Sequence, residues 1–268
     1  MKLNASFYQQ FDADLSRDVP AEGYGGWQQA QIEIAPEHTA LVVMHVWEFG
    51  TPADYPGWYR CVEYIGRAQR ICREVFGPLL TAVRRSGFNL VHVAGGSEYY
   101  KKYPGYKLVE SLAGPEPKPD GVASDPALDR LHKLRGQRVF VGPHNEADVG
   151  RGFANLDFAP QARPLDDEPI AATSGQLLAW CRSRGINHLI YTGFAIDGCL
   201  LISPGGMIDM SRRGVMCSTI RQAVTAIENK ETARQELAKQ LALWRVGLLM
   251  GFVLELDDFI QALPAPGR

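Results

Sequence analysis

The feature that most restricts the fold is an apolar run without alternation, TALVVMHV at residues 39–46. A strand with one face in water alternates apolar and polar side chains, whereas a strand covered on both faces is apolar throughout. Strands of the second kind are typical of parallel sheets that carry helices on both sides. The run therefore predicts a buried strand at the centre of such a sheet.

Further strands and helices alternate along the chain. We predict strands at 88–94, 137–142, 188–194 and 215–220, and helices at about 60–86, 126–135, 173–184, 231–243 and 257–263. Parallel strands need crossover connections, and a helix is the usual one. The pattern predicts an α/β protein of Rossmann-like layout, a three-layer α/β/α sandwich with a mostly parallel central sheet.

Two segments depart from this alternation. Residues 1–36 are polar and contain the Gly-rich stretch AEGYGGW, and we interpret them as an N-terminal extension lying on one main domain, residues 37–268. Residues 97–136 begin with a Tyr/Lys-rich stretch and continue into a Pro-rich one. An excursion of this kind is typical of lids and pocket walls, so we expect it to border a site.

The composition of the chain indicates which kinds of binding partner to expect. The chain is 46% hydrophobic and 22% charged, with a formal net charge of -2 and no basic stripe. These values disfavour nucleic acid or an anionic membrane as partner and leave a small-molecule substrate as the expectation. The N-terminus lacks a signal-peptide pattern, and the five cysteines form no CxxC pair. We therefore expect reduced thiols and a cytoplasmic protein.

Chemically active side chains are expected at one edge of the sheet, because ligands of open parallel sheets bind beyond the carboxyl ends of the strands. The residues at or just after the ends of the predicted strands include His45, Trp47, Glu48, Ser97, Tyr99, His144, Phe194, Ala195 and Cys199.

Cys199 is the cysteine whose position indicates chemistry. It follows the strand HLIYTGF where the next helix begins, so the helix dipole and free amides there favour a thiolate. The same amides can stabilise an oxyanion. The other four cysteines lie in predicted helices or inside a strand, where cysteine packs as a small apolar residue. Position alone leaves the same packing role open for Cys199.

Two other residues near the ends of predicted strands are expected to have structural roles. His92 alternates within a predicted strand and is expected to be a core histidine with a satisfied side chain. Asp197 is expected to cap the helix that carries Cys199, since Asp is a favoured N-cap residue.

The segment 185–222, GINHLIYTGFAIDGCLLISPGGMIDMSRRGVMCSTIRQ, resembles the nucleophile region of isochorismatase-like cysteine hydrolases. The positions that match the family pattern are Gly193, Cys199, Asp209 and Gly214. The positions that depart from it are Ile196, Leu200 and Gln222, which replace its Thr, Val and last Asp. Residues 204–206 are an insertion. ALVVMHVWEFG at 40–50 resembles the opening strand of the family, with His45 at the position of its Asp.

The resemblance implies an isochorismatase-like fold, a cis peptide near Phe194–Ala195 and hydrolysis of a small amide or ureide C–N bond. It also implies an Asp–Lys–Cys triad, but His45 replaces the Asp, and residues 164–177, where the Lys is expected, contain no lysine. The histidine motif that binds metal in nicotinamidases is missing, and no dinucleotide or phosphate-loop motif is present. We therefore expect no metal and no cofactor. Family members are often oligomers, which together with the aromatic segment 97–106 favours a homo-oligomer.

Two hypotheses follow. In the first, the imidazole of His45 takes the proton of Cys199, because a Cys–His pair is a common source of thiolate. The supporting groups would be Glu48, His144 and the backbone amide of Ala195 as oxyanion donor. The substrate pocket would contain Trp47, Ser97, Tyr99 and Phe194. In the second, the family triad has been lost, and the protein is a small-molecule-binding or scaffold protein without catalysis.

Overall fold

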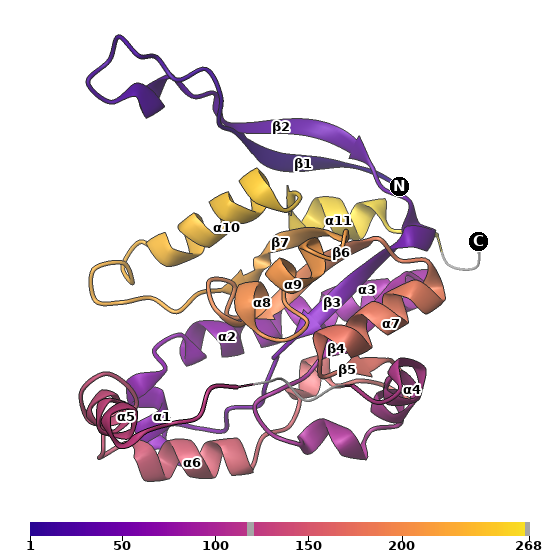
Figure 1. The fold of residues 1–268 in the computed structure, drawn as a ribbon. Helices are drawn as coiled ribbons and strands as arrows, with labels where there is room; N and C mark the ends of the chain where they lie inside the picture. The colour runs from indigo at the N-terminus through magenta and orange to yellow at the C-terminus, as the bar shows by residue number, and fades with distance from the viewer. Residues whose placement is uncertain (117–120, 266–268) are drawn as a thin grey trace.

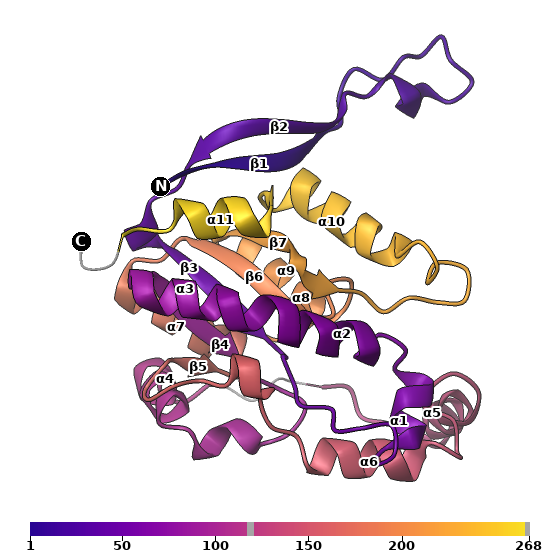
Figure 2. The same ribbon diagram turned by 180° about the vertical axis from the view of Figure 1, so that it is seen from behind.

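The computed structural model describes residues 1–116 and 121–265, which form an eight-stranded sheet with helices on both faces (Figures 1 and 2). The strands are β1 (Lys2–Gln9), β2 (Gly26–Glu33), β3 (Thr39–Met44), β4 (Asn89–Val93), β5 (Ile170–Ala171), β6 (His188–Phe194), β7 (Met216–Thr225) and β8 (Val253–Leu254). Their order across the sheet is β2-β1-β8-β7-β6-β3-β4-β5. All neighbours from β8 to β5 are parallel, so the predicted three-layer sandwich with a mostly parallel sheet is confirmed.

The first predicted strand lies at the centre. All six residues of β3 are buried, and the strand pairs with β6 on one side and β4 on the other. Leu41 and Val43 pack into one apolar cluster, while Val42 and Met44 pack into the cluster on the opposite face. An unbroken apolar run is what burial on both faces requires, and the prediction for this strand is confirmed.

Two helical layers supply those clusters. One face of the sheet carries α1 (Pro56–Cys61), α2 (Ile65–Ile71), a π-helical turn (Cys72–Phe76), α3 (Gly77–Ser86) and α11 (Leu256–Ala262). The other carries α4 (Pro104–Ala113), α7 (Ser174–Arg184), α8 (Cys199–Ile202), α9 (Met207–Ser211) and α10 (Leu237–Leu249). At the periphery lie α5 (Pro126–Arg138) and α6 (Glu146–Ala154), with short 3-10 turns at Pro20–Gly23, Pro36–His38, Tyr99–Lys102 and Pro160–Ala162.

The helix expected over residues 60–86 begins later than predicted. Its continuous part runs from Ile65 to Ser86 through the π-helical turn, and α1 is a separate turn of helix. Gly87 ends it as expected, with φ 68° in the left-handed region where a side chain would be strained.

One predicted strand, 137–142, is wrong. Residues 137–138 end α5, and the following residues form no strand; the side chains of Val139 and Phe140 are 63% and 54% exposed. The position beside β4 is taken by the two-residue strand β5. A β-branched and aromatic run satisfies the local preference of a strand, but nothing in it specifies a partner in the sheet.

The N-terminal segment extends the sheet. β1 and β2 form an antiparallel hairpin, and β1 pairs antiparallel with β8, with Ala5 opposite Leu254. The chain between the two strands projects from the body (Figure 1). The excursion at 97–136 supplies α4, which packs against α7, and α5, which has no buried residue.

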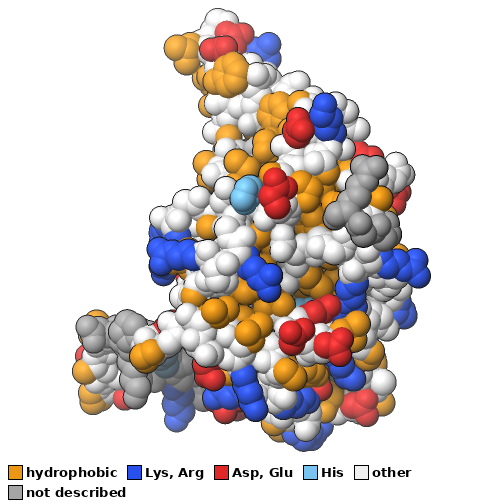
Figure 3. Space-filling model, turned by 90° about the vertical axis from the view of Figure 1, so that its right-hand side faces the viewer, with side chains coloured by type: hydrophobic (Ala, Val, Ile, Leu, Met, Phe, Trp, Pro, Cys, Tyr) orange, Lys and Arg blue, Asp and Glu red, His pale blue; other side chains and the backbone are white. Residues whose placement is uncertain are grey.

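The face seen in Figure 3 carries acidic and basic side chains interspersed with apolar ones, and neither sign gathers into a stripe there. Among the described residues, no helix combines the length and apolar character needed to cross a membrane.

Candidate active site

The loops that follow the central strands meet at one edge of the sheet. Met44 at the end of β3 is level with Val93 at the end of β4 and with Gly193 near the end of β6. The three segments that carry His45, Tyr99 and Cys199 therefore start from the same edge, as expected for parallel strands.

Cys199 is the first residue of α8 and is half-buried. The segment before it turns sharply: the carbonyl of Ala195 accepts hydrogen bonds from the amides of Gly198 and Leu200, at 3.3 and 3.0 Å. The peptide Phe194–Ala195 is cis, as the resemblance implied. Within residues 1–116 and 121–265, the backbone amides of Ala195 and Cys199 donate to no other protein group. Both amides are therefore candidate donors to an oxyanion formed at the thiol, although Ala195 itself is fully buried.

Asp197 does not cap α8. Its Oδ1 accepts a hydrogen bond from the amide of Ile227 at 2.8 Å, and the N-cap of α8 is Gly198. Burial raises the pKa of Asp197, and the neighbouring carboxylates of Glu228 and Glu63 raise it further. The carboxyl group of Asp197 thus joins the loop that carries Cys199 to the segment that follows β7.

Tyr64 is a neighbour of Cys199 that the sequence did not indicate. Burial raises the pKa of its hydroxyl, and the proximity of Cys199 and Asp197 raises it further, so the phenol stays protonated. It lies in the cluster under α2, and its ring packs edge-on against Phe49 at 6.5 Å. A tyrosine that starts a helix 135 residues before the cysteine gives no local signal of this contact.

Arg67, one turn further along α2, joins α2 to the end of β7. Its guanidinium donates to the hydroxyl of Thr225 at 3.0 Å and to the carbonyl of Ala226 at 3.1 Å, and it pairs with Glu63. Since the carbonyl of Thr225 accepts from the amide of Ile196 at 2.8 Å, Arg67 fixes the strand end beside the Cys199 loop.

His45 is buried, and its ring faces β4. The ring stacks on Trp47 with centroids 4.9 Å apart, and a Cβ placed on Gly95 would lie 2.8 Å from its Nε2. The backbone has φ 52°, in the left-handed region, and Nδ1 has no hydrogen-bond partner among the described residues. Burial lowers the pKa of His45 to about 4, so the imidazole is uncharged near neutral pH. No hydrogen bond joins it to Cys199 in the described chain.

Two expected pocket residues contact each other. Nε1 of Trp47 donates to the hydroxyl of Tyr99 at 2.9 Å, and Phe153 and Phe158 pack against this pair. Trp47 is buried, whereas Tyr99 is partly exposed and borders the rim.

The other two expected pocket residues lie differently. Phe194 is buried in the core, with its ring edge-on to Phe76 at 5.9 Å, so it does not line the rim. Ser97 is half-buried and makes no side-chain hydrogen bond within the described residues.

Glu48 and His144, the expected supporting groups, are both exposed. The carboxylate of Glu48 accepts from the amide of Gly50 at 3.0 Å. His144 lies in the turn before α6, beside Gly142. Neither side chain hydrogen bonds to His45 in the part of the chain that the structure describes.

The region where the family lysine was expected carries Glu168 instead, and this residue faces away from the rim. Its carboxylate binds Arg84 at 2.7 Å and Nε2 of His92 at 3.0 Å. His92 is therefore a buried core histidine, as predicted, but its side chain is not fully satisfied, because Nδ1 has no hydrogen-bond partner among the described residues. In residues 1–116 and 121–265, no three His, Cys, Asp or Glu side chains are placed to share a metal ion.

No protein-family model matches the sequence, and no curated protein is a significant match. Solved structures with a similar fold include a putative isochorismatase from Burkholderia xenovorans LB400, at 16% identity and TM-score 0.48, covering 86% of this chain and 92% of that one. A cysteine hydrolase from Pseudomonas syringae pv. phaseolicola 1448A has 15% identity and TM-score 0.46, covering 85% and 93%. An N-carbamoylsarcosine amidase from Thermoplasma acidophilum has 17% identity and TM-score 0.41, covering 82% and 97%. These identities and TM-scores are too low to indicate an activity for this chain.

Proposed function

We propose that this protein is a cysteine hydrolase that cleaves a C–N bond of a small amide or ureide, with Cys199 as the nucleophile. The observation that carries the proposal is the half-buried thiol at the sheet edge, next to the unused amides of Ala195 and Cys199. Two N–H groups beside a nucleophile are what a tetrahedral oxyanion needs for stabilisation. The resemblance of residues 185–222 to cysteine hydrolases supports the same assignment.

The reaction has two steps. The sulfur of Cys199 attacks the carbonyl carbon, its proton passes to a base, and the carbonyl oxygen becomes an oxyanion held by the amides of Ala195 and Cys199. Cleavage of the C–N bond releases the amine, which takes up a proton, and leaves a thioester. Water then attacks the thioester, releasing the acid and restoring the thiol.

His45 is the proposed base, and its environment predicts a slow enzyme. With a pKa of about 4 the imidazole accepts a proton less readily than an ordinary histidine near neutral pH. A substrate would also have to bring the His45 and Cys199 side chains into contact through a rearrangement of the rim.

The second candidate function is small-molecule binding without catalysis. The observation that favours it is again His45, whose neutral ring stacks on Trp47 and turns toward Gly95. The absence of lysine from residues 164–177 points the same way. In this case the rim near Tyr99 and Cys199 would hold a ligand intact.

One set of variants separates the two functions. We would measure ammonia or amine release from a panel of small amides and ureides with the parent, Cys199→Ser and, as the matched control, Cys61→Ser, because Cys61 is the other half-buried thiol. The hydrolase proposal predicts turnover that Cys61→Ser retains and Cys199→Ser loses by at least about a thousandfold. Equal turnover in parent and Cys199→Ser would refute it.

The base is tested separately by alkylation of Cys199 with iodoacetamide as a function of pH. If His45 takes the proton, His45→Ala slows alkylation of Cys199 and moves its pH profile upward. An unchanged profile would exclude His45 as the base. Binding of panel compounds by calorimetry without turnover would establish the second function.

A further inference from the structure

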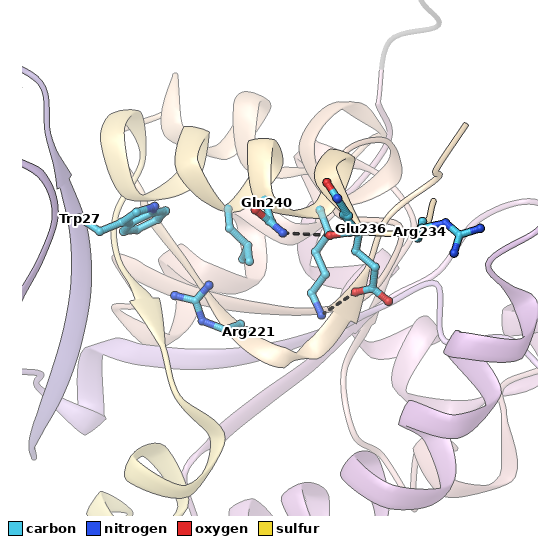
Figure 4. Close-up of a pocket in the computed structure, with 8 residues that line it drawn as sticks. Trp27, Arg221, Arg234, Glu236 and Gln240 are labelled. Carbon is cyan, nitrogen blue, oxygen red and sulfur yellow. Dashed lines mark hydrogen bonds and ion pairs between the residues drawn. The ribbon is translucent and has the colours of Figure 1, made fainter. Parts of the chain in front are cut away.

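A hollow with three cationic residues in its lining, Arg221, Arg234 and Lys239, lies beside α10. It has a volume of about 520 Å³, and its lining includes Trp27 on β2, Arg221 on β7, Leu243 on α10 and the charged pair Glu236 and Lys239. Figure 4 shows Trp27 and Arg221 on one side of this hollow and Glu236 and Arg234 on the other. Cys199 does not line it.

Arg221 is held in place while part of its guanidinium stays free. The group lies 5.7 Å from the ring centroid of Trp27, and its Nε donates to Glu255 at 2.9 Å. Trp27 is fixed in turn because its ring packs on Gly247, where a Cβ would come within 2.9 Å of the indole. In the described residues the two terminal nitrogens of Arg221 donate to no protein group. A fixed fork with free N–H groups fits a carboxylate or phosphate.

Lys239 supplies a second cation, and its ion pair with a carboxylate is a long one. Its side chain is 17% exposed, and its ammonium lies 3.8 Å from the nearest carboxylate, that of Glu236, which is long for a hydrogen bond. Burial is the largest effect and lowers the pKa of Lys239. Glu236 and Glu228 raise this pKa, whereas Arg221 and Arg67 lower it. An anionic ligand beside the ammonium would offset the cost of its burial.

The backbone of Glu236 is strained in support of this arrangement. Its φ and ψ are 50° and 44°, a left-handed conformation that is rare for a residue with a side chain. Its carboxylate lies between Arg67, at 3.4 Å, and Lys239, at 3.8 Å. Strained residues of this kind tend to occur at binding sites, where the surrounding structure holds them in place.

Positive charge continues into an adjoining hollow. This second space, about 280 Å³, shares Glu236 and Lys239 with the first and is lined also by Arg67, Arg70 and Glu74. Cations outnumber carboxylates in the lining of the two hollows, but Glu63 and Glu255, outside that lining, pair with Arg67 and Arg221.

We propose that this hollow binds a small molecule through an oxyanion group, a phosphate or a carboxylate, held between Arg221 and Lys239. Cys199 is not among the residues that line this hollow, so the site adds a ligand that hydrolysis at Cys199 does not require. The remaining volume beside Leu243 and Trp27 accommodates the uncharged part of the ligand.

The test is isothermal titration calorimetry of the full chain in Hepes at low chloride, with inorganic phosphate and citrate as probes. The expected result is saturable one-to-one binding with a Kd below about 1 mM for at least one probe. Lys239→Gln removes a cation and should weaken binding by about tenfold or more, whereas Glu236→Gln removes the competing carboxylate and should tighten it several-fold. Arg213→Gln, an exposed arginine outside the hollow, is the matched control and should leave the Kd unchanged.

Lys239→Gln should weaken binding and Glu236→Gln should tighten it. A general effect on folding would not change the Kd of the two variants in opposite directions. Circular dichroism checks that each variant is folded, and if Lys239→Gln is not, the tighter binding of Glu236→Gln decides alone. Failure of both probes to saturate, or the same Kd in parent and Glu236→Gln, would overturn the proposal. Preference for phosphate or for citrate identifies which oxyanion the ligand carries.

Discussion

Glu168 offers the sharpest test of the electrostatics at the edge of the sheet. Its side chain is 17% exposed and accepts hydrogen bonds from Arg84, from His92 and from the amide of Leu165. Burial alone would raise the pKa of this carboxyl, but these hydrogen bonds outweigh it and lower the pKa to about 2. Glu168→Gln removes the charge while keeping the size, and it leaves Arg84 half-buried without its partner.

The magnitude follows from the pKa. A fall from the ordinary value of 4.5 to about 2 corresponds, at 1.36 kcal/mol for each pH unit, to about 3 kcal/mol of folding free energy near neutral pH. Because the folded-state pKa is the lower one, this stabilisation is complete above about pH 4.5 and is lost as the pH falls toward 2. By the same relation, about 1 kcal/mol remains at pH 3.

The assay is urea unfolding followed by tryptophan fluorescence at pH 7 and in steps down to pH 3. Glu168→Gln should lower the free energy of unfolding by about 3 kcal/mol at pH 7, and the gap to the parent should narrow as the pH falls. Glu231→Gln is the control, because Glu231 forms an exposed pair with Lys230 and its loss should have no measurable effect. A gap that is the same at pH 3 as at pH 7 would refute the reasoning.

Three further predictions concern the cysteines, the sheet and His45. A thiol reagent should modify Cys199 first and Cys61 next in the native protein, with the rest protected until unfolding, as counted by mass spectrometry. The protected thiols, whose pKa burial raises to about 12, are Cys72, Cys181 and Cys217. Gly193→Ala should prevent stable folding, seen as insoluble expression or a lost thermal transition, because its φ is 121° and a Cβ would lie 1.9 Å from the carbonyl oxygen of Met44. NMR of the His45 ring should show a neutral imidazole down to about pH 5, and a midpoint above 6 would contradict its burial.

The central strands could be predicted from sequence because burial on both faces of a sheet requires a run of apolar residues without alternation, and few other environments require such a run. β3 and β6 are mostly apolar in sequence and buried along their whole length, and the prediction located both correctly. The edges carry less information. β2 is mostly exposed, with the polar sequence GWQQAQIE, and β5 has two residues, too few for any period to be recognised. Which segment pairs at the edge of the sheet depends on residues far away in the sequence, and the local sequence pattern does not reveal it.

The candidate site shows the same division. Cys199 could be located because a cysteine between a strand and a helix is a local feature, and its neighbours Ala195 and Asp197 come with it. Tyr64 and Arg67 reach the same place from α2, and their roles depend on how that helix packs, which no short motif encodes. The orientation of the His45 side chain at the end of β3 depends on the backbone angles there, and it could not be predicted from the sequence either.

The hairpin of β1 and β2 has a consequence for how the chain is assembled. β1 joins the rest of the sheet through β8, so β1 must wait for a strand that follows it in synthesis by most of the described chain. Until then the parallel strands can form around β3, but the hairpin has no edge to join and its apolar face, Leu3 and Ala5, stays uncovered. Closing this contact is therefore expected late in folding, and it ties the two ends of the described chain into one cooperative unit.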